Sequence, residues 1–193
     1  MPHLAKYEKQ FPTWATGVEP ARTTSDTLLD FMASMPNPPK RIAIVTSKFA
    51  PCLLVANGMR EGLKRRGLTE LMFLEWDFGN RDFGAIASRL KDAKPDFIYA
   101  GVIAMEGMML LDAMKKIDYK APPMFHHLPS PGPMVNSPDA QGMLVATIFE
   151  EHEPMMNNAG AKEFVPVFNA RAKSANLPDN AVDTQAAASN ADR

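Results

Sequence analysis

Two adjacent histidines and an acidic run are among the residues whose types could support binding chemistry. His126 and His127 end an apolar segment, and Glu150–Glu153 reads EEHE. Imidazoles bind metals or hydrogen-bond to carboxylates and carbonyls. The helical HExxH spacing of a zinc site is absent, and adjacent side chains on a strand point to opposite faces, so we expect no metal site. Structural or solvent-facing histidines and a ligand contact both remain open.

Cys52 and Glu106 are the other candidates for reactive or binding groups. Cys52 is the single cysteine and lies at a predicted helix start, where the pKa of a thiol can fall. A nucleophile also needs a base and an oxyanion site, and the sequence nominates neither. Glu106 opens a predicted helix, where the dipole favours a carboxylate, and its place near a strand end also makes it a ligand-contact candidate. We therefore expect no catalytic residue and no enzyme.

Apolar strands that alternate with helices must position these residues. The first four strands are predicted at residues 40–47, 70–76, 95–101 and 122–127. Helical spacing follows each of the first three, which predicts right-handed crossovers and an α/β fold, a parallel sheet with helices on both faces. In such sheets a ligand binds beyond the carboxyl ends of the strands. The candidate binding loops are Ser47–Cys52, Trp76–Phe78, Val102–Glu106 and His126–Pro131.

Local signals predict the remaining elements. A helix at residues 25–35 is capped by Ser25 or Asp26 and ends before a proline-rich turn. Apolar stripes place three helices between the strands, and Asp82 is a good N-cap for the one after the second strand. A fifth strand and a last helix are predicted at residues 141–149 and 161–175.

Composition and charge restrict the function classes. The chain has 193 residues and 46% apolar content, enough for one domain with a sizeable core. A net charge of −1 gives no basic face for nucleic acid. No run reaches about 18 apolar residues, so we expect no direct membrane insertion. A single cysteine excludes an internal disulfide and a cysteine-based zinc cluster, and no cofactor is expected.

The sequence resembles the second lobe of type I periplasmic substrate-binding proteins, in the leucine/isoleucine/valine-binding group of ABC importers. The similarity lies in the order and spacing of PPKRIAIVTSKF, NGMREGLKRRGL, NRDFGAIASRLKDAKPDFIYAG, LLDAMKKIDYK and DAQGMLVATI. The most specific piece is RDFGAIASRLKDAKPDFIYAG, with its Asp-Phe helix start, amphipathic helix, Pro-Asp turn and apolar strand. The resemblance covers residues 11–190 through the ordered set rather than through one motif.

The resemblance implies two α/β lobes that trap a ligand between them by hinge closure. On this basis residues 1–24 are a hinge or first-lobe remnant, 25–150 the second lobe, and 151–193 the hinge return with the start of first-lobe helices. The first lobe is not in the sequence, so we expect a truncated gene product. The resemblance implies a membrane ABC permease as partner and a periplasmic location. Because MPHLAKYEKQ has no apolar signal segment, the chain would be cytoplasmic if expressed as written.

The resemblance also implies where ligand contacts lie. Amino-acid-binding members carry aromatic residues after the first and third strands of this lobe, and after the fourth an acidic residue that pairs with the ligand ammonium. These places fall on Pro51, Ala104 and His127, none of which keeps the family's residue. Because an unpaired buried ammonium is costly, a ligand without one fits better.

His127 could hold a carboxylate or carbonyl, and Phe49 and Trp76 could supply apolar walls. Among an amino acid, an amide and a hydrophobic or aromatic carboxylate, we therefore favour the carboxylate. The predicted ligand-binding residues are Ser47, Phe49, Pro51, Trp76, Ala104, Glu106 and His127.

Two other function classes remain as alternatives. One is an intracellular ligand-sensing regulatory lobe, which a partner domain would distinguish. The other is a flavodoxin-like α/β enzyme or signalling domain. Support for it is weak. A phosphate-binding loop after the first strand would need Gly or Ser/Thr donors, but SKFAPC supplies only the Ser47 hydroxyl before Pro51, which has no N–H. A phospho-accepting receiver domain would need acidic residues at the end of the first strand, and RIAIVTS has none.

Overall fold

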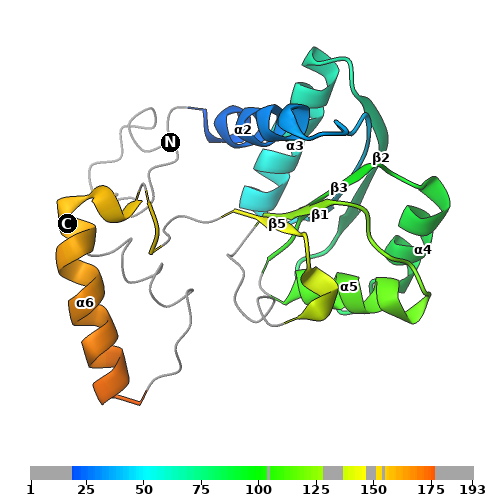
Figure 1. Cartoon of the computed structure of the whole chain (residues 1–193). Coiled ribbons are helices and arrows are strands. Elements are labelled where there is room, and N and C mark those ends of the chain that lie inside the picture. The colour runs from blue at the N-terminus through cyan, green and yellow to red at the C-terminus, as the bar shows by residue number, and fades with distance from the viewer. Residues whose placement is uncertain (1–18, 104, 128–136, 147–150, 154, 177–193) are drawn as a thin grey trace. The chain divides into compact units, whose positions relative to one another are not determined.

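The described part of the chain belongs to two compact units. The computed structural model describes residues 19–103, 105–127, 137–146, 151–153 and 155–176 (Figure 1). The larger unit comprises Glu19–Pro129 and Pro133–Ala146, and the rest of the chain forms the smaller one. These bounds differ from the three predicted segments, whose assignment to hinge and lobe stays a prediction.

The larger unit alternates helices and strands around one parallel sheet. Its elements are α2 (Pro20–Ser34), β1 (Arg41–Ser47), α3 (Ala50–Arg65), β2 (Thr69–Trp76), α4 (Gly84–Ala93), β3 (Phe97–Gly101), α5 (Glu106–Lys116), β4 (Met124–His126), the 3₁₀ turn η2 (Pro138–Ala140) and β5 (Leu144–Val145). The strands are all parallel, in the order β2-β1-β3-β4-β5. The predicted α/β class is confirmed.

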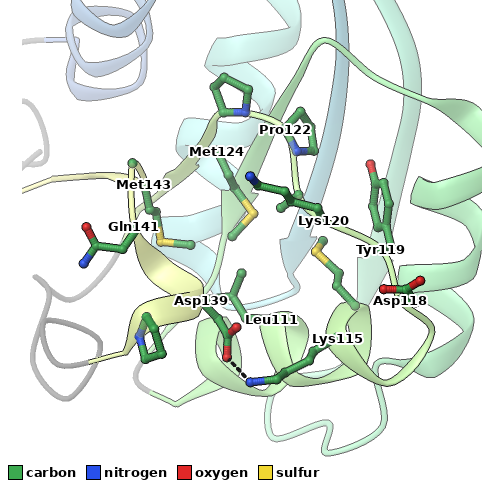
Figure 2. A pocket seen from close by; sticks show the side chains of 15 residues that line it. Leu111, Lys115, Asp118, Tyr119, Lys120, Pro122, Met124, Asp139, Gln141 and Met143 are labelled. Carbon is green, nitrogen blue, oxygen red and sulfur yellow. Dashed lines mark hydrogen bonds and ion pairs between the residues drawn. The ribbon is translucent and has the colours of Figure 1, made fainter.

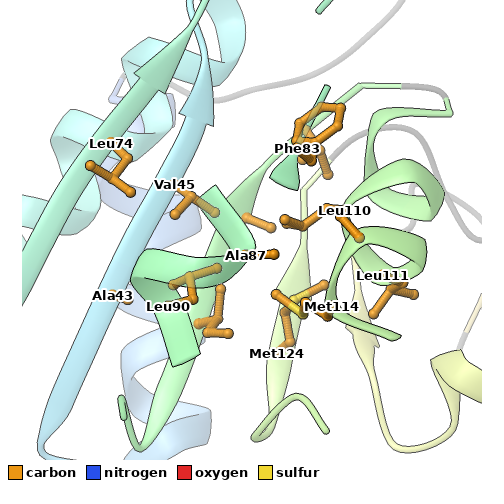
Figure 3. Close-up of a cluster of buried hydrophobic side chains, with 14 of the residues drawn as sticks. Ala43, Val45, Leu74, Phe83, Ala87, Leu90, Leu110, Leu111, Met114 and Met124 are labelled. Atoms are coloured by element: carbon orange, nitrogen blue, oxygen red, sulfur yellow. The ribbon is translucent and has the colours of Figure 1, made fainter. Parts of the chain in front are cut away.

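Two apolar layers cover the sheet, one on each face. Side chains alternate along a strand, so Val45 joins the layer that packs against α4 and α5 (Figure 3). Ile44 joins the opposite layer, beneath α2 and α3. The two helix pairs lie on opposite sides of the sheet in Figure 1. This is why β1 and β3 read as near-continuous apolar runs and are buried almost throughout.

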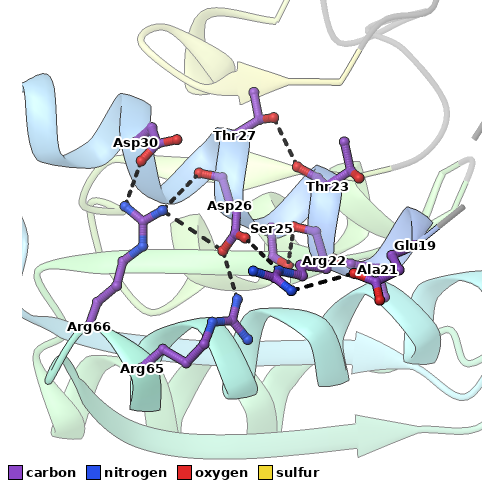
Figure 4. Close-up of polar contacts among 10 residues, drawn as sticks. All are labelled: Glu19, Ala21, Arg22, Thr23, Ser25, Asp26, Thr27, Asp30, Arg65 and Arg66. Atoms are coloured by element: carbon purple, nitrogen blue, oxygen red, sulfur yellow. Dashed lines mark hydrogen bonds and ion pairs between the residues drawn. The ribbon is translucent and has the colours of Figure 1, made fainter. Parts of the chain in front are cut away.

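The first helix begins earlier than predicted. α2 starts at Pro20, whose fixed φ and missing N–H suit a first helical turn, so the expected cap at Ser25 or Asp26 is wrong. Ser25 lies inside the helix, where its hydroxyl donates to the carbonyl of Ala21. Asp26 forms an ion pair with Arg65 of α3 at 2.7 Å (Figure 4). Asp26 therefore ties α2 to α3, whereas the Ser25 hydroxyl bonds only within α2.

Two other boundaries differ by a few residues. The fifth strand, expected at 141–149, pairs only over Leu144–Val145, and residues 147–150 lie outside the described residues. α4 begins at Gly84 rather than directly after Asp82. Asp82 still satisfies a helix-start donor, because its Oδ1 accepts from the Gly84 N–H at 2.9 Å.

The described part of the smaller unit is mainly one helix. The 3₁₀ turn η3 (Met155–Asn157) precedes α6 (Ala159–Ser174), which begins two residues before the predicted 161–175. The Asn158 side chain accepts from the Gly160 N–H and so supplies the N-cap. Within the described ranges, no helix is long and apolar enough to cross a membrane.

Candidate ligand-binding site

The carboxyl ends of the strands meet at one edge of the sheet. Register pairs Ser47 with Trp76 and Ala100 with His126, so these strand ends are neighbours. The chain therefore leaves β1, β2, β3 and β4 at the same edge of the sheet. We call these strand ends, with the described residues that follow them, the carboxyl edge, the place where parallel α/β sheets bind ligands.

Glu106 and Ser47 are brought together at the carboxyl edge. The Glu106 side chain is buried; its Oε1 accepts from the Ser47 hydroxyl at 3.4 Å and its Oε2 from the Ile103 N–H at 3.1 Å. The second contact satisfies the backbone N–H of Ile103, which lies in the loop between β3 and α5. The carboxylate of Glu106 thus joins the end of β1 to the loop before α5 and accepts from two donors.

An aromatic pair forms the apolar surface of the carboxyl edge. The rings of Phe49 and Phe78 lie 5.3 Å apart between centroids, and Phe78 is 63% exposed. Beside them Lys48 pairs with Asp77 at 2.8 Å, so these two opposite charges satisfy each other. Met105, in the loop before α5, is also exposed. Phe78 was not among the predicted site residues, although it lies in a predicted binding loop.

Trp76 is not an exposed wall of the site. It is only 6% exposed and packs edge-on against Phe83, with ring centroids 5.1 Å apart. Trp76 follows Leu74 by two residues, and both belong to the layer beneath α4 and α5. Because side chains alternate between the two faces of a strand, the indole of Trp76 points into the core. Phe78 lies beyond the end of the strand and is exposed to solvent.

Both histidines are buried and neutral near physiological pH. His126 is 1% exposed and His127 6%, so the solvent-facing interpretation is wrong. Burial lowers the pKa of each to about 4, and the neighbouring His127 contributes to the shift of His126. Among the described residues, neither ring nitrogen of His126 and not Nδ1 of His127 finds a hydrogen-bond partner. His127 packs beside the rings of Tyr99 and Phe125.

Cys52 lies at the start of α3 but is not an activated thiol. It is fully buried, and its Sγ contacts the Val102 carbonyl oxygen at 3.8 Å. Burial, with a smaller contribution from the charge of Glu106, raises the pKa of the thiol to about 11. Desolvation therefore outweighs the helix start, which by itself would lower the pKa.

The remaining predicted site residues contribute less. Pro51 lies exposed in the first turn of α3, and Ala104 lies outside the described residues. Within the described ranges, no three His, Cys, Asp or Glu side chains come together in a way that could hold a metal ion. Sequence reasoning missed Phe78, for which the exposed loop after a strand end was the available signal.

Comparison with solved structures identifies the fold. An extracellular ligand-binding receptor from Rhodopseudomonas palustris superposes with a TM-score of 0.71 at 14% identity, over 89% of this chain and 48% of that one. A leucine-binding protein from Thermotoga maritima gives 0.66 at 15% identity, over 89% and 46%. An ABC transporter solute-binding protein from R. palustris, in complex with benzoate, gives 0.63 at 17% identity, over 83% and 41%.

This chain therefore spans about half the length of the solved proteins that it resembles, which fits a single lobe. No curated protein matches the sequence. A family model described as periplasmic binding protein matches residues 4–191, nearly the whole chain. The chain belongs to the periplasmic binding protein family.

Proposed function

We propose that this chain is the second, ligand-binding lobe of an ABC importer's solute receptor, which closes on its ligand by hinge motion. The proposal includes a periplasmic location and a membrane permease as partner, and family membership supports both. Its structural support is the carboxyl edge, which presents the exposed Phe78 beside the half-buried Phe49 where parallel α/β sheets bind ligands.

For the ligand we propose a hydrophobic or aromatic carboxylate rather than an α-amino acid. The observation that carries this proposal is the hydrogen bonding of Glu106, the single carboxylate among the predicted site residues. Glu106 is buried and accepts hydrogen bonds from Ser47 and Ile103, so an ammonium group that paired with it would compete with both donors. An ammonium group buried here without a counter-charge would be costly.

The other groups of the edge suit the same ligand class. Phe49 and Phe78 offer ring faces and edges against which an aromatic ring can pack. His127, neutral near physiological pH, can donate one N–H to a carboxylate or carbonyl oxygen. The similar solute-binding protein from R. palustris holds benzoate, a ligand of this class. The raised pKa of Cys52 supports binding rather than nucleophilic catalysis.

The test is an NMR titration of the chain with benzoate and, separately, with leucine. Binding is monitored through the ¹³C methyl resonance of Met105 at the carboxyl edge. We expect benzoate to shift this resonance with a Kd in the millimolar range, since one lobe supplies about half of a cleft. Phe78→Ala should weaken benzoate about three- to tenfold, the loss of one aromatic contact. Phe31→Ala, an exposed phenylalanine on α2, is the matched control. Leucine binding at micromolar affinity would refute the proposed ligand class.

A further inference from the structure

A cavity lies at the opposite, amino-terminal edge of the sheet. It is bounded by the start of β4 at Met124, the turn before β5 at Met143, and the end of α5 with the turn that follows (Figure 2). Its volume is about 560 Å³, which is typical of small-molecule sites. Because the strands are parallel, this edge is the end of the sheet remote from the carboxyl edge.

The cavity has an apolar lining rich in thioethers. Leu111, Met114 and Met124 are almost fully buried beneath it, and Met143 is half-buried at its side. Figure 2 shows the side chains of Met124, from β4, and Met143, from the turn before β5, beside the same space, which Met114 of α5 also lines. Methionine is flexible and polarisable and makes favourable contacts with aromatic rings, so this lining suits a planar apolar body.

Among the described residues that line the cavity, one lysine has no polar partner. Lys115 is not available, because its ammonium pairs with Asp139 at 2.7 Å along the rim. Lys120 extends across the cavity in Figure 2 and has no polar partner among the residues that the structure describes. Asp118, which also lines the cavity, lies below Tyr119 in the same view, away from the Lys120 ammonium. An anionic group on an apolar ligand would therefore meet the Lys120 ammonium.

We propose that this cavity is a second ligand site, separate from the carboxyl edge, that takes a small aromatic carboxylate with its ring against Met143, over the buried Met114 and Met124, and its carboxylate on Lys120. The site does not depend on the proposed receptor function, since its lining lies at the other end of the sheet.

The experiment is a titration of the full chain, labelled with ¹³C at the methionine methyl groups, with 1-naphthoate and with the uncharged 1-naphthamide. We expect naphthoate to shift the methyl resonances of Met114, Met124 and Met143. Lys120→Met should weaken naphthoate about threefold, as expected for one exposed ion pair, and leave naphthamide unchanged. Lys116→Met, at the last residue of α5 and outside the cavity lining, is the matched control.

Met143→Gln tests the apolar wall without emptying the core, because Met143 is only half-buried; it should weaken both probes. Shifts confined to Met105 would place binding at the carboxyl edge alone and overturn the second site. Unchanged methyl resonances of Met114, Met124 and Met143 would also overturn it. Equal loss of naphthoate binding in Lys120→Met and Lys116→Met would overturn the assignment of the carboxylate to Lys120.

Discussion

At the scale of single residues, the surroundings decide what each polar group can do. Glu106, His127 and Cys52 all belong to the carboxyl edge, yet the first is hydrogen-bonded, the second neutral and the third protonated. Removal from water without a compensating charge favours the neutral form of the imidazole and the thiol. The edge therefore offers hydrogen bonds and apolar contact rather than a reactive group.

The buried histidines predict a loss of stability in mild acid. Their pKa is about 4 in the folded chain and 6.5 when unfolded, so the unfolded chain binds more protons between these values. The free energy of unfolding should therefore fall as the pH drops through this range, by about 1.4 kcal/mol per pH unit for each histidine. Urea unfolding at several pH values measures the slope.

His126→Gln and His127→Gln should each flatten that slope. His152→Gln, at an exposed position, should leave it unchanged and serves as the control. A free energy of unfolding that stays constant across the same pH range would contradict the assignment of neutral, desolvated imidazoles to the folded state.

At the scale of elements, close contact between α2 and α3 defines one side of the lobe. Asp26 accepts from Arg65, and Asp30 from Arg66, both at 2.7 Å (Figure 4). These pairs are largely exposed, so each contributes only about 0–1 kcal/mol. The tighter constraint is Gly58, where the two helices approach so closely that a side chain would not fit.

Gly58→Ala should destabilise the chain although alanine is the better helix former. An added Cβ would lie 2.5 Å from the carbonyl oxygen of Ala21 and 2.9 Å from its Cβ, so α2 must shift. We expect a net loss of about 1–2 kcal/mol, because overpacking exceeds the gain in helix propensity. Gly84→Ala, whose Cβ would meet only the Asp82 carboxylate at 3.3 Å, should be near neutral. Thermal melts compare the two, and equal stability would argue against the tight contact.

At the scale of the whole molecule, the apolar core that the described residues form belongs to the larger unit. Both apolar layers are built from residues between Leu28 and Ala146. Among the described residues of the smaller unit, Val165 is the buried apolar side chain, and α6 also stacks Phe164 on Phe168. The larger unit thus contains the burial that drives folding.

A fragment of residues 19–146 should consequently fold by itself. We expect cooperative urea unfolding with a midpoint close to that of the full chain, because both apolar layers are retained. A fragment of residues 50–146 is the control: it lacks α2 and the central strand β1, and should not fold. A 19–146 fragment that shows no unfolding transition would contradict a core that is complete within the larger unit.

Local patterns in the sequence were enough to predict the alternation of helices and strands and the parallel sheet, because apolar periodicity and turn residues act over a few neighbouring positions. They also located the carboxyl edge, since parallel topology follows from that alternation. Boundaries were less accurate: Pro20 began α2 earlier than the Ser25 or Asp26 signal.

Only the tertiary structure decided how the site residues are used. Ser47 meets Glu106 across 59 positions of sequence, Trp76 turns into the core while Phe78 stays exposed, and desolvation raises the pKa of Cys52. The cavity beneath Lys120 likewise joins segments from α5, β4 and the turn before β5. Each depends on which distant groups pack together and exclude water, and periodicity along the chain carries no information on that.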